Sequence, residues 1–76
     1  MTTQELETIR SIWPSLTQVL FVPHTAQEYE RLVATLDTLV DLVGENEAHP
    51  LASCMEIIGV LIEKYEDEHI PELSDL

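Results

Sequence analysis

Two stretches of the chain place apolar residues at the period of an α-helix, three and four residues apart. The first stretch contains Tyr29, Leu32, Val33, Leu36, Leu39, Val40 and Val43. The second repeats the same seven spacings with Leu51, Cys54, Met55, Ile58, Leu61, Ile62 and Tyr65. This pattern is typical of an amphipathic helix that buries one face. It predicts long helices over residues 25–44 and 50–70.

Residues at the ends of both stretches support these helices. Thr25 and Glu28 have the spacing of a capping box, and Gly44 follows the last apolar position of the first stretch. Pro50 suits the first turn of the second helix, and Pro71 cannot continue that helix. The linker over residues 45–49 is short, so we expect an antiparallel hairpin.

Antiparallel pairing fixes which helix ends meet. Tyr29 opens the first apolar stripe and Tyr65 closes the second. The two rings should therefore lie at the same end of the hairpin.

The N-terminal segment has a weaker helical pattern. Thr2 and Glu5 have capping-box spacing, and Pro14 interrupts the run that follows. The apolar positions of that run are Leu6, Ile9, Trp13, Leu16 and Leu20. We expect a short helix over about residues 3–12, a boundary or kink at Trp13, and a turn or short helix over residues 14–20. Residues 22–24 should form an extended connector.

Together these elements predict an all-α fold with one helical domain over residues 1–76. It would be a small bundle, in which the N-terminal arm and connector (residues 1–24) pack on the hairpin and a tail follows over residues 71–76. A chain of this length buries little surface and often gains stability from a partner.

The second long helix carries apolar residues beside its main stripe. Ile57 and Val60 lie there, with Gly59 between them. Glycine within a helix is unfavourable and suggests that another backbone approaches closely. Either the N-terminal segment covers Ile57 and Val60, or they form the face of a homodimer. We interpret Trp13 as a core or interface anchor.

The charge of the chain restricts its partners. Three basic residues face fifteen acidic ones, a net charge of −12. Nucleic-acid and anionic-membrane binding depend on Lys and Arg, so we expect neither here, and no DNA-binding residue. Residues 1–27 carry a net −1, and the rest of the chain carries −11. The densest acidic run includes Tyr65, Glu66, Asp67 and Glu68, which we predict to contact a protein; the alternative is a solvated face.

The sequence contains only weak candidates for catalytic or metal-binding residues. Glu66 and His69 have the Glu-x-x-His spacing of di-iron bundles, but this pair occurs once and lies beside the apolar stripe. Cys54 lies within that stripe, as expected of a buried and unreactive thiol. His49 precedes Pro50 and suits a capping or linker role. We expect no catalytic residue, no metal, no cofactor and no enzyme activity.

Cellular location follows from similar observations. The longest apolar runs, such as residues 19–23, are too short to span a bilayer. The single cysteine, Cys54, fits a reducing compartment. We expect a cytoplasmic protein.

The stretch from Thr25 to Pro71 resembles the N-terminal region of HigA-type antitoxins, which are helix-turn-helix regulators of toxin–antitoxin modules. One motif is Thr25-Ala26-Gln27-Glu28-Tyr29-Glu30-Arg31, leading into Leu36-Asp37-Thr38-Leu39. The more distinctive motif is Leu61-Ile62-Glu63-Lys64-Tyr65-Glu66-Asp67-Glu68-His69-Ile70-Pro71, similar to the family ending L-I-x-x-Y-E-x-x-H-x-P.

The resemblance implies dimerisation or contact with a basic ribonuclease toxin. It also implies a DNA-binding domain where this chain ends, at Leu76. We therefore expect an antitoxin shortened to its N-terminal region, or a short reading frame without the DNA-binding domain. A self-associating helical module is the alternative function, and a metal-dependent helical hydrolase is the third.

Overall fold

A computed structural model of the chain describes residues 1–69. It contains helices α1 (Thr3–Leu16), α2 (Ala26–Val43) and α3 (Ala52–His69), and no strand within the described range. The predicted all-α fold is confirmed. The predicted end of the last helix at residue 70, Pro71 and the tail over residues 71–76 lie outside the described residues.

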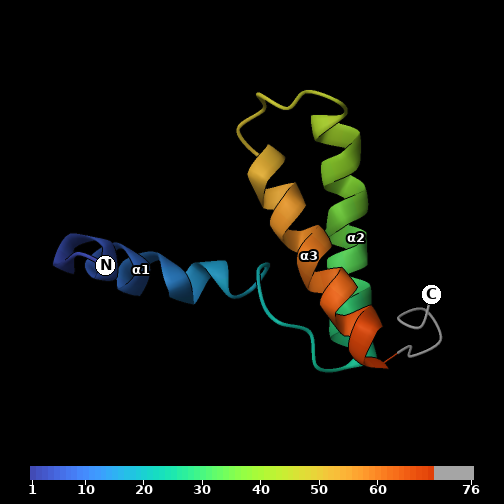
Figure 1. Cartoon of the computed structure of the whole chain (residues 1–76), viewed down its shortest axis with the longest axis horizontal. Helices are drawn as coiled ribbons and strands as arrows, with labels where there is room; N and C mark the ends of the chain where they lie inside the picture. Colours follow the sequence, from blue (N-terminus) through green and yellow to red (C-terminus); the bar gives the residue numbers. More distant parts are fainter. Residues whose placement is uncertain (70–76) are drawn as a thin grey trace.

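Helices α2 and α3 form the predicted antiparallel hairpin and pack along their apolar stripes (Figure 1). The buried core consists of Leu32, Leu39, Val43, Ile58 and Ile62. Two stripe positions near the turn are largely exposed, Val40 at 49% and Leu51 at 38%. Helices α2 and α3 separate toward the turn (Figure 1), and Val40 lines the open groove at that end.

The predicted cap at the start of α2 is present, but one of its two hydrogen bonds has a different donor from the one expected. The Thr25 hydroxyl accepts a hydrogen bond from the Glu28 N–H at 3.1 Å. The Glu28 carboxylate accepts from the His24 N–H at 2.8 Å, one residue earlier than the Thr25 N–H of a capping box. The cap therefore also fixes the end of the connector.

The turn between α2 and α3 uses both residues that the sequence indicated. Gly44 has φ +59°, in the left-handed region that favours glycine, and its N–H donates to the Val40 carbonyl. At the other side of the turn, Nδ1 of His49 accepts a hydrogen bond from the Leu51 N–H at 3.0 Å. His49 therefore has the capping role that was predicted for it, ahead of α3.

Helix α1 corrects the expected break at Trp13. The Thr2–Glu5 capping box is present, and the helix continues through Pro14 to Leu16. Proline removes one backbone donor, but here it lies in the last turn of a solvent-exposed helix, where water can satisfy the freed carbonyl. The turn continues beyond Leu16, since the Thr17 N–H donates to the Trp13 carbonyl at 2.9 Å.

Helix α1 also does not pack on the hairpin, contrary to the expected arrangement. It projects away from α2 and α3 as an arm and buries no residue (Figure 1). The radius of gyration is 14.4 Å, whereas about 11 Å is typical of a compact chain of this length. The connector packs on the core in place of α1, through Leu20 and Phe21.

A single arginine of α2 holds the connector. Arg31 donates from Nη2 to the Gln18 carbonyl at 2.9 Å, and its guanidinium carbon lies 4.9 Å from the centre of the Phe21 ring. A cation over an aromatic face is attracted by the electrons of the ring. These two contacts fix where the arm leaves the hairpin.

Candidate protein-interaction surfaces

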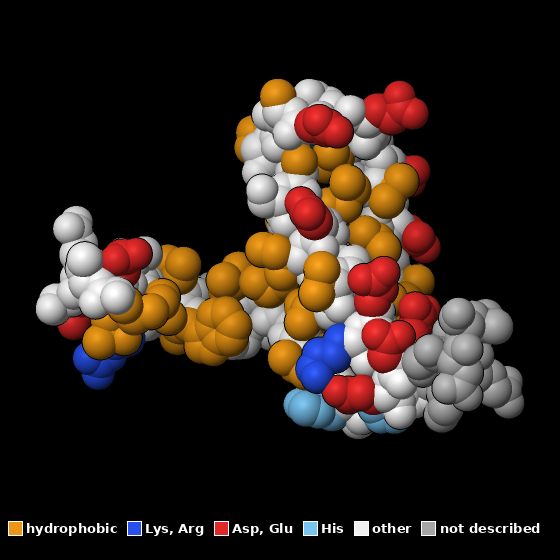
Figure 2. Space-filling model, viewed as in Figure 1, with side chains coloured by type: hydrophobic (Ala, Val, Ile, Leu, Met, Phe, Trp, Pro, Cys, Tyr) orange, Lys and Arg blue, Asp and Glu red, His pale blue; other side chains and the backbone are white. Residues whose placement is uncertain are grey.

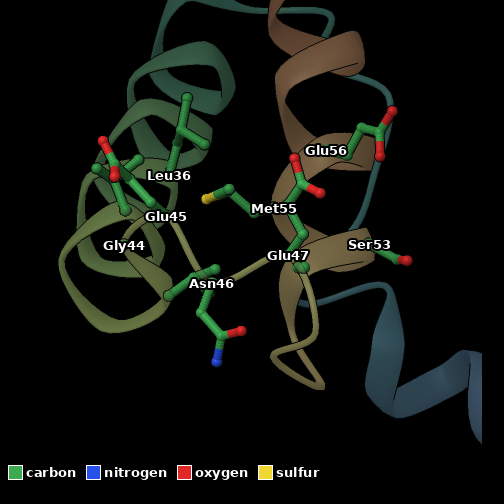
Figure 3. Close-up of a pocket in the computed structure, with 11 residues that line it drawn as sticks. Leu36, Gly44, Glu45, Asn46, Glu47, Ser53, Met55 and Glu56 are labelled. Carbon is green, nitrogen blue, oxygen red and sulfur yellow. The ribbon is translucent and has the colours of Figure 1, made fainter.

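An open groove lies between α2 and α3 at the turn end of the hairpin. Its volume is about 990 Å³, and Leu36, Val40, Val43 and Met55 form its apolar lining. Leu36 from α2 and Met55 from α3 lie on opposite sides of the groove and face its interior (Figure 3). The groove exists because the two helices separate here and no other element of residues 1–69 fills the gap.

Three acidic residues are among those that line this groove. Glu45 and Glu47 come from the turn and Glu56 from α3 (Figure 3). Within residues 1–69 none of the three makes a hydrogen bond or an ion pair. An apolar floor with an acidic rim suits a basic, amphipathic segment of another protein.

A second apolar surface lies on α3, beside the stripe that packs on α2. Ile57 and Val60 are 47% and 57% exposed, and with Ser53, Glu56 and Leu61 they line a smaller hollow of about 410 Å³. The expectation that the N-terminal segment of the same chain covers these two residues is wrong. The alternative of a homodimer face stays a prediction.

The arm presents a third apolar surface. Leu6, Ile9, Ile12 and Trp13 are each at least 40% exposed. Figure 2 shows hydrophobic side chains along the arm, whereas the acidic side chains concentrate on the hairpin. Trp13 therefore lies on an open apolar face and is not a core residue.

A ring cluster closes the end of the hairpin opposite the turn. Tyr29 stacks on Tyr65 with ring centres 4.7 Å apart, which confirms that the two tyrosines share one end. His69 also stacks on Tyr65, with ring centres 4.1 Å apart. The Tyr29 hydroxyl donates to Oε2 of Glu66 at 2.7 Å. Tyr65, Glu66 and His69 thus have a structural role in this cluster.

Hydrogen bonds shift the pKa of two groups at this end. The bond to Glu66, and to a lesser degree burial, raises the pKa of the Tyr29 hydroxyl above its ordinary value. The Lys64 ammonium lies 2.6 Å from Oε1 of Glu68 and lowers the pKa of that carboxyl. All three acids of the predicted site, Glu66, Asp67 and Glu68, therefore have interactions within the chain.

The predicted interaction residues thus fall in separate places. Trp13 lies on the arm, Ile57 and Val60 on the open face of α3, and the acidic run beside the ring cluster. The sequence reasoning missed the groove at the turn. The signals in the sequence that could have indicated this groove were the linker acids Glu45 and Glu47 and the apolar residue Val40 near the end of the first stripe.

Two further findings concern the described residues alone. They contain no group of three or more His, Cys, Asp and Glu side chains placed to hold a metal ion, and the Cys54 thiol is half-buried and free. In the same range, no helix combines the length and apolar character that crossing a bilayer demands.

No family model, curated protein or solved structure matches this chain. The resemblance to HigA-type antitoxins rests on the sequence motifs given above. The ring cluster gives a physical reason for three residues of the more distinctive motif, Tyr65, Glu66 and His69.

Proposed function

We propose that this chain is a protein-binding region of a HigA-like antitoxin and transcriptional regulator, and that its partner is a basic ribonuclease toxin in the cytoplasm. The observation that carries the proposal is the apolar groove at the turn with its three unpaired carboxylates. The proposal gives the chain no catalytic role and no direct contact with nucleic acid.

The chemistry of such a toxin fits the groove. A ribonuclease binds anionic RNA, so its working surface is expected to be basic. The rim acids Glu45, Glu47 and Glu56 would attract that surface, and the apolar floor would take an aliphatic or aromatic anchor from it. The charge of −11 over residues 28–76 would speed the encounter through long-range attraction.

The test measures binding of a HigB-type ribonuclease toxin to the full chain by surface plasmon resonance. We expect an association rate that falls steeply between low and high salt, because salt screens the attraction between the partners. Replacing Glu45, Glu47 and Glu56 with Gln should slow association about tenfold or more. A matched control removes the same charge from α2 through Glu30→Gln, Asp37→Asn and Asp41→Asn and should change the rate far less.

A second pair of variants tests the apolar floor. Val40 and Leu42 lie two positions apart on α2, and hence on different faces, and are 49% and 59% exposed; only Val40 lines the groove. Val40→Glu should weaken binding about tenfold or more, while Leu42→Glu should leave it nearly unchanged. Equal effects of the two variants, or a rate that is insensitive to salt, would contradict the proposal.

A self-associating module is the second candidate function. The observation that favours it is the arm, whose apolar face has no partner within the described chain. The third candidate, a metal-dependent hydrolase, gains no support from any cluster of ligands among residues 1–69.

A further inference from the structure

We propose that two copies of this chain exchange their arms, so that α1 of each copy packs on the open face of α3 in the other. The inference does not rest on toxin binding, because the α3 face and the groove at the turn share only Ser53 and Glu56 at their margins. Each copy contributes one apolar helix and one apolar docking face that residues 1–69 of the same chain leave uncovered.

The two surfaces match in chemistry and in length. The arm offers Leu6, Ile9, Ile12 and Trp13, and the hollow on α3 is lined by Ile57, Val60 and Leu61. A 14-residue helix is about 21 Å long, and the α3 face from Ser53 to Lys64 extends about 16 Å. An amphipathic helix laid in an apolar groove is a common mode of protein recognition.

The connector argues for a second copy as the occupant. Arg31 binds the Gln18 carbonyl and the Phe21 ring, and Phe21 packs on the core. These contacts direct the arm away from its own α3 (Figure 1). The backbone bonds from the Thr17 N–H to the Trp13 carbonyl and from the Leu20 N–H to the Leu16 carbonyl join the arm to this anchored connector. Docking within one chain would require the arm to turn back at these residues, whereas docking on another copy leaves the bonds intact.

The charge distribution favours the arm, and not the hairpin, as the part of the chain that contacts a second copy. Residues 1–27 carry a net −1, while residues 28–76 carry −11. Contact between two hairpins would bring two strongly acidic bodies together, which is unfavourable. The arm carries Arg10 with Glu5 and Glu7, so it can approach the hairpin of a second copy with little repulsion.

Charge also selects the face on which the arm docks. The groove at the turn has three acids and no cation in its lining, so it suits a basic occupant. The hollow on α3 has one acid in its lining, Glu56. Lys64 follows Val60 by four residues and lies on the same side of the helix, where its ammonium pairs with Glu68. A nearly neutral helix is better matched to that face.

The test follows the mass and the fluorescence of the full chain over the micromolar to millimolar range. Trp13 is the single tryptophan and is 46% exposed, so its emission reports on the arm alone. We expect the weight-average mass in analytical ultracentrifugation to rise toward twice the chain mass. Trp13 emission should shift to the blue over the same concentrations, because docking buries the ring.

Four variants locate the contact. Ile9→Glu on the arm and Val60→Glu on α3 should each raise the dimer dissociation constant about tenfold or more. Ser11→Glu, on the opposite side of α1, and Leu42→Glu, on α2, add the same charge at exposed positions and should change it little. Circular dichroism of each variant verifies that the helices are retained.

Mixing the two weakened variants separates arm exchange from other dimers. In an equimolar mixture, the intact arm of Val60→Glu meets the intact α3 face of Ile9→Glu, while the other contact of the same dimer carries both substitutions. A contact already disrupted by one Glu loses little more through a second, so the mixture should associate more tightly than either variant alone. A dimer built from two arms or from two α3 faces would be weakened by only one of the substitutions, which overturns the proposal. A wild-type chain that stays monomeric would also overturn the proposal, as would a blue shift of Trp13 emission without any change in the weight-average mass.

Discussion

The hairpin and the arm are built from similar sequence patterns and end in different environments. Both α1 and α2 begin with a threonine cap and carry an apolar stripe. Yet α2 has three buried residues and α1 has none. An amphipathic pattern indicates that one face of a helix is stabilised by burial. Whether the same chain buries that face depends on the linker to the next helix.

The linkers explain the difference. Between α2 and α3 the chain turns back at Gly44 and His49, which places two stripes face to face. Between α1 and α2 the residues Leu20 and Phe21 occupy the core surface themselves. The connector therefore takes the position on the hairpin that α1 would otherwise fill.

The largest expected difference between the two regions is in how much the free energy of unfolding falls when an apolar side chain is shortened to Ala. Leu32 is fully buried, so Leu32→Ala should lower the free energy of unfolding by about 3 kcal/mol. Ile9→Ala in the arm should change it by less than about 0.5 kcal/mol, because Ile9 is 40% exposed. Urea unfolding of dilute protein, followed by circular dichroism, compares the two; equal losses would mean that the arm belongs to the core.

A smaller effect is expected at the ring cluster. Tyr29→Phe removes the hydrogen bond to Glu66 and should cost about 1 kcal/mol of unfolding free energy at neutral pH. Because the pKa of Tyr29 is raised in the folded chain, this contribution is complete below the ordinary tyrosine value near 10. It is lost as the pH rises through the folded value.

Unfolding curves at neutral pH and at successive alkaline pH values measure that loss. The difference in stability between the wild type and Tyr29→Phe should shrink as the pH rises above 10. A difference that stays constant over this range would contradict the role assigned to the hydroxyl.

The smallest expected effect is at Gly59, and it has the opposite sign. Nothing lies within 4 Å of a Cβ added there, so Gly59→Ala should raise the free energy of unfolding by about 0.5–1 kcal/mol. The dimer dissociation constant of Gly59→Ala then tests the prediction that the backbone of another helix approaches Gly59 closely. Weaker association with higher monomer stability would locate a partner at Gly59, whereas lower monomer stability would contradict the open space.

The sequence could predict the hairpin because its signals are local. Thr25, Gly44 and His49 act on backbone groups within a few residues of themselves. The register that pairs Tyr29 with Tyr65 follows from two periodic stripes and one short turn. No long-range contact had to be guessed for these features.

The connector and the surfaces depend on contacts that no local rule supplies. Arg31 recognises the backbone carbonyl of Gln18, which has no signature in the side-chain sequence. The Glu66 carboxylate was interpreted as part of a contact surface, because nothing in the sequence shows that the Tyr29 hydroxyl reaches it. The groove at the turn depends on how far two helices separate, which is a property of packing.

The short turn between α2 and α3 has a consequence for how quickly the chain folds. The one pair of helices that packs together in the described chain is also adjacent in the sequence. Proteins dominated by such local contacts fold in microseconds to milliseconds, because little chain entropy is lost in closing the loop. Formation of the hairpin is therefore a fast event within one molecule, whereas burial of the arm in the proposed dimer would require an encounter between two molecules.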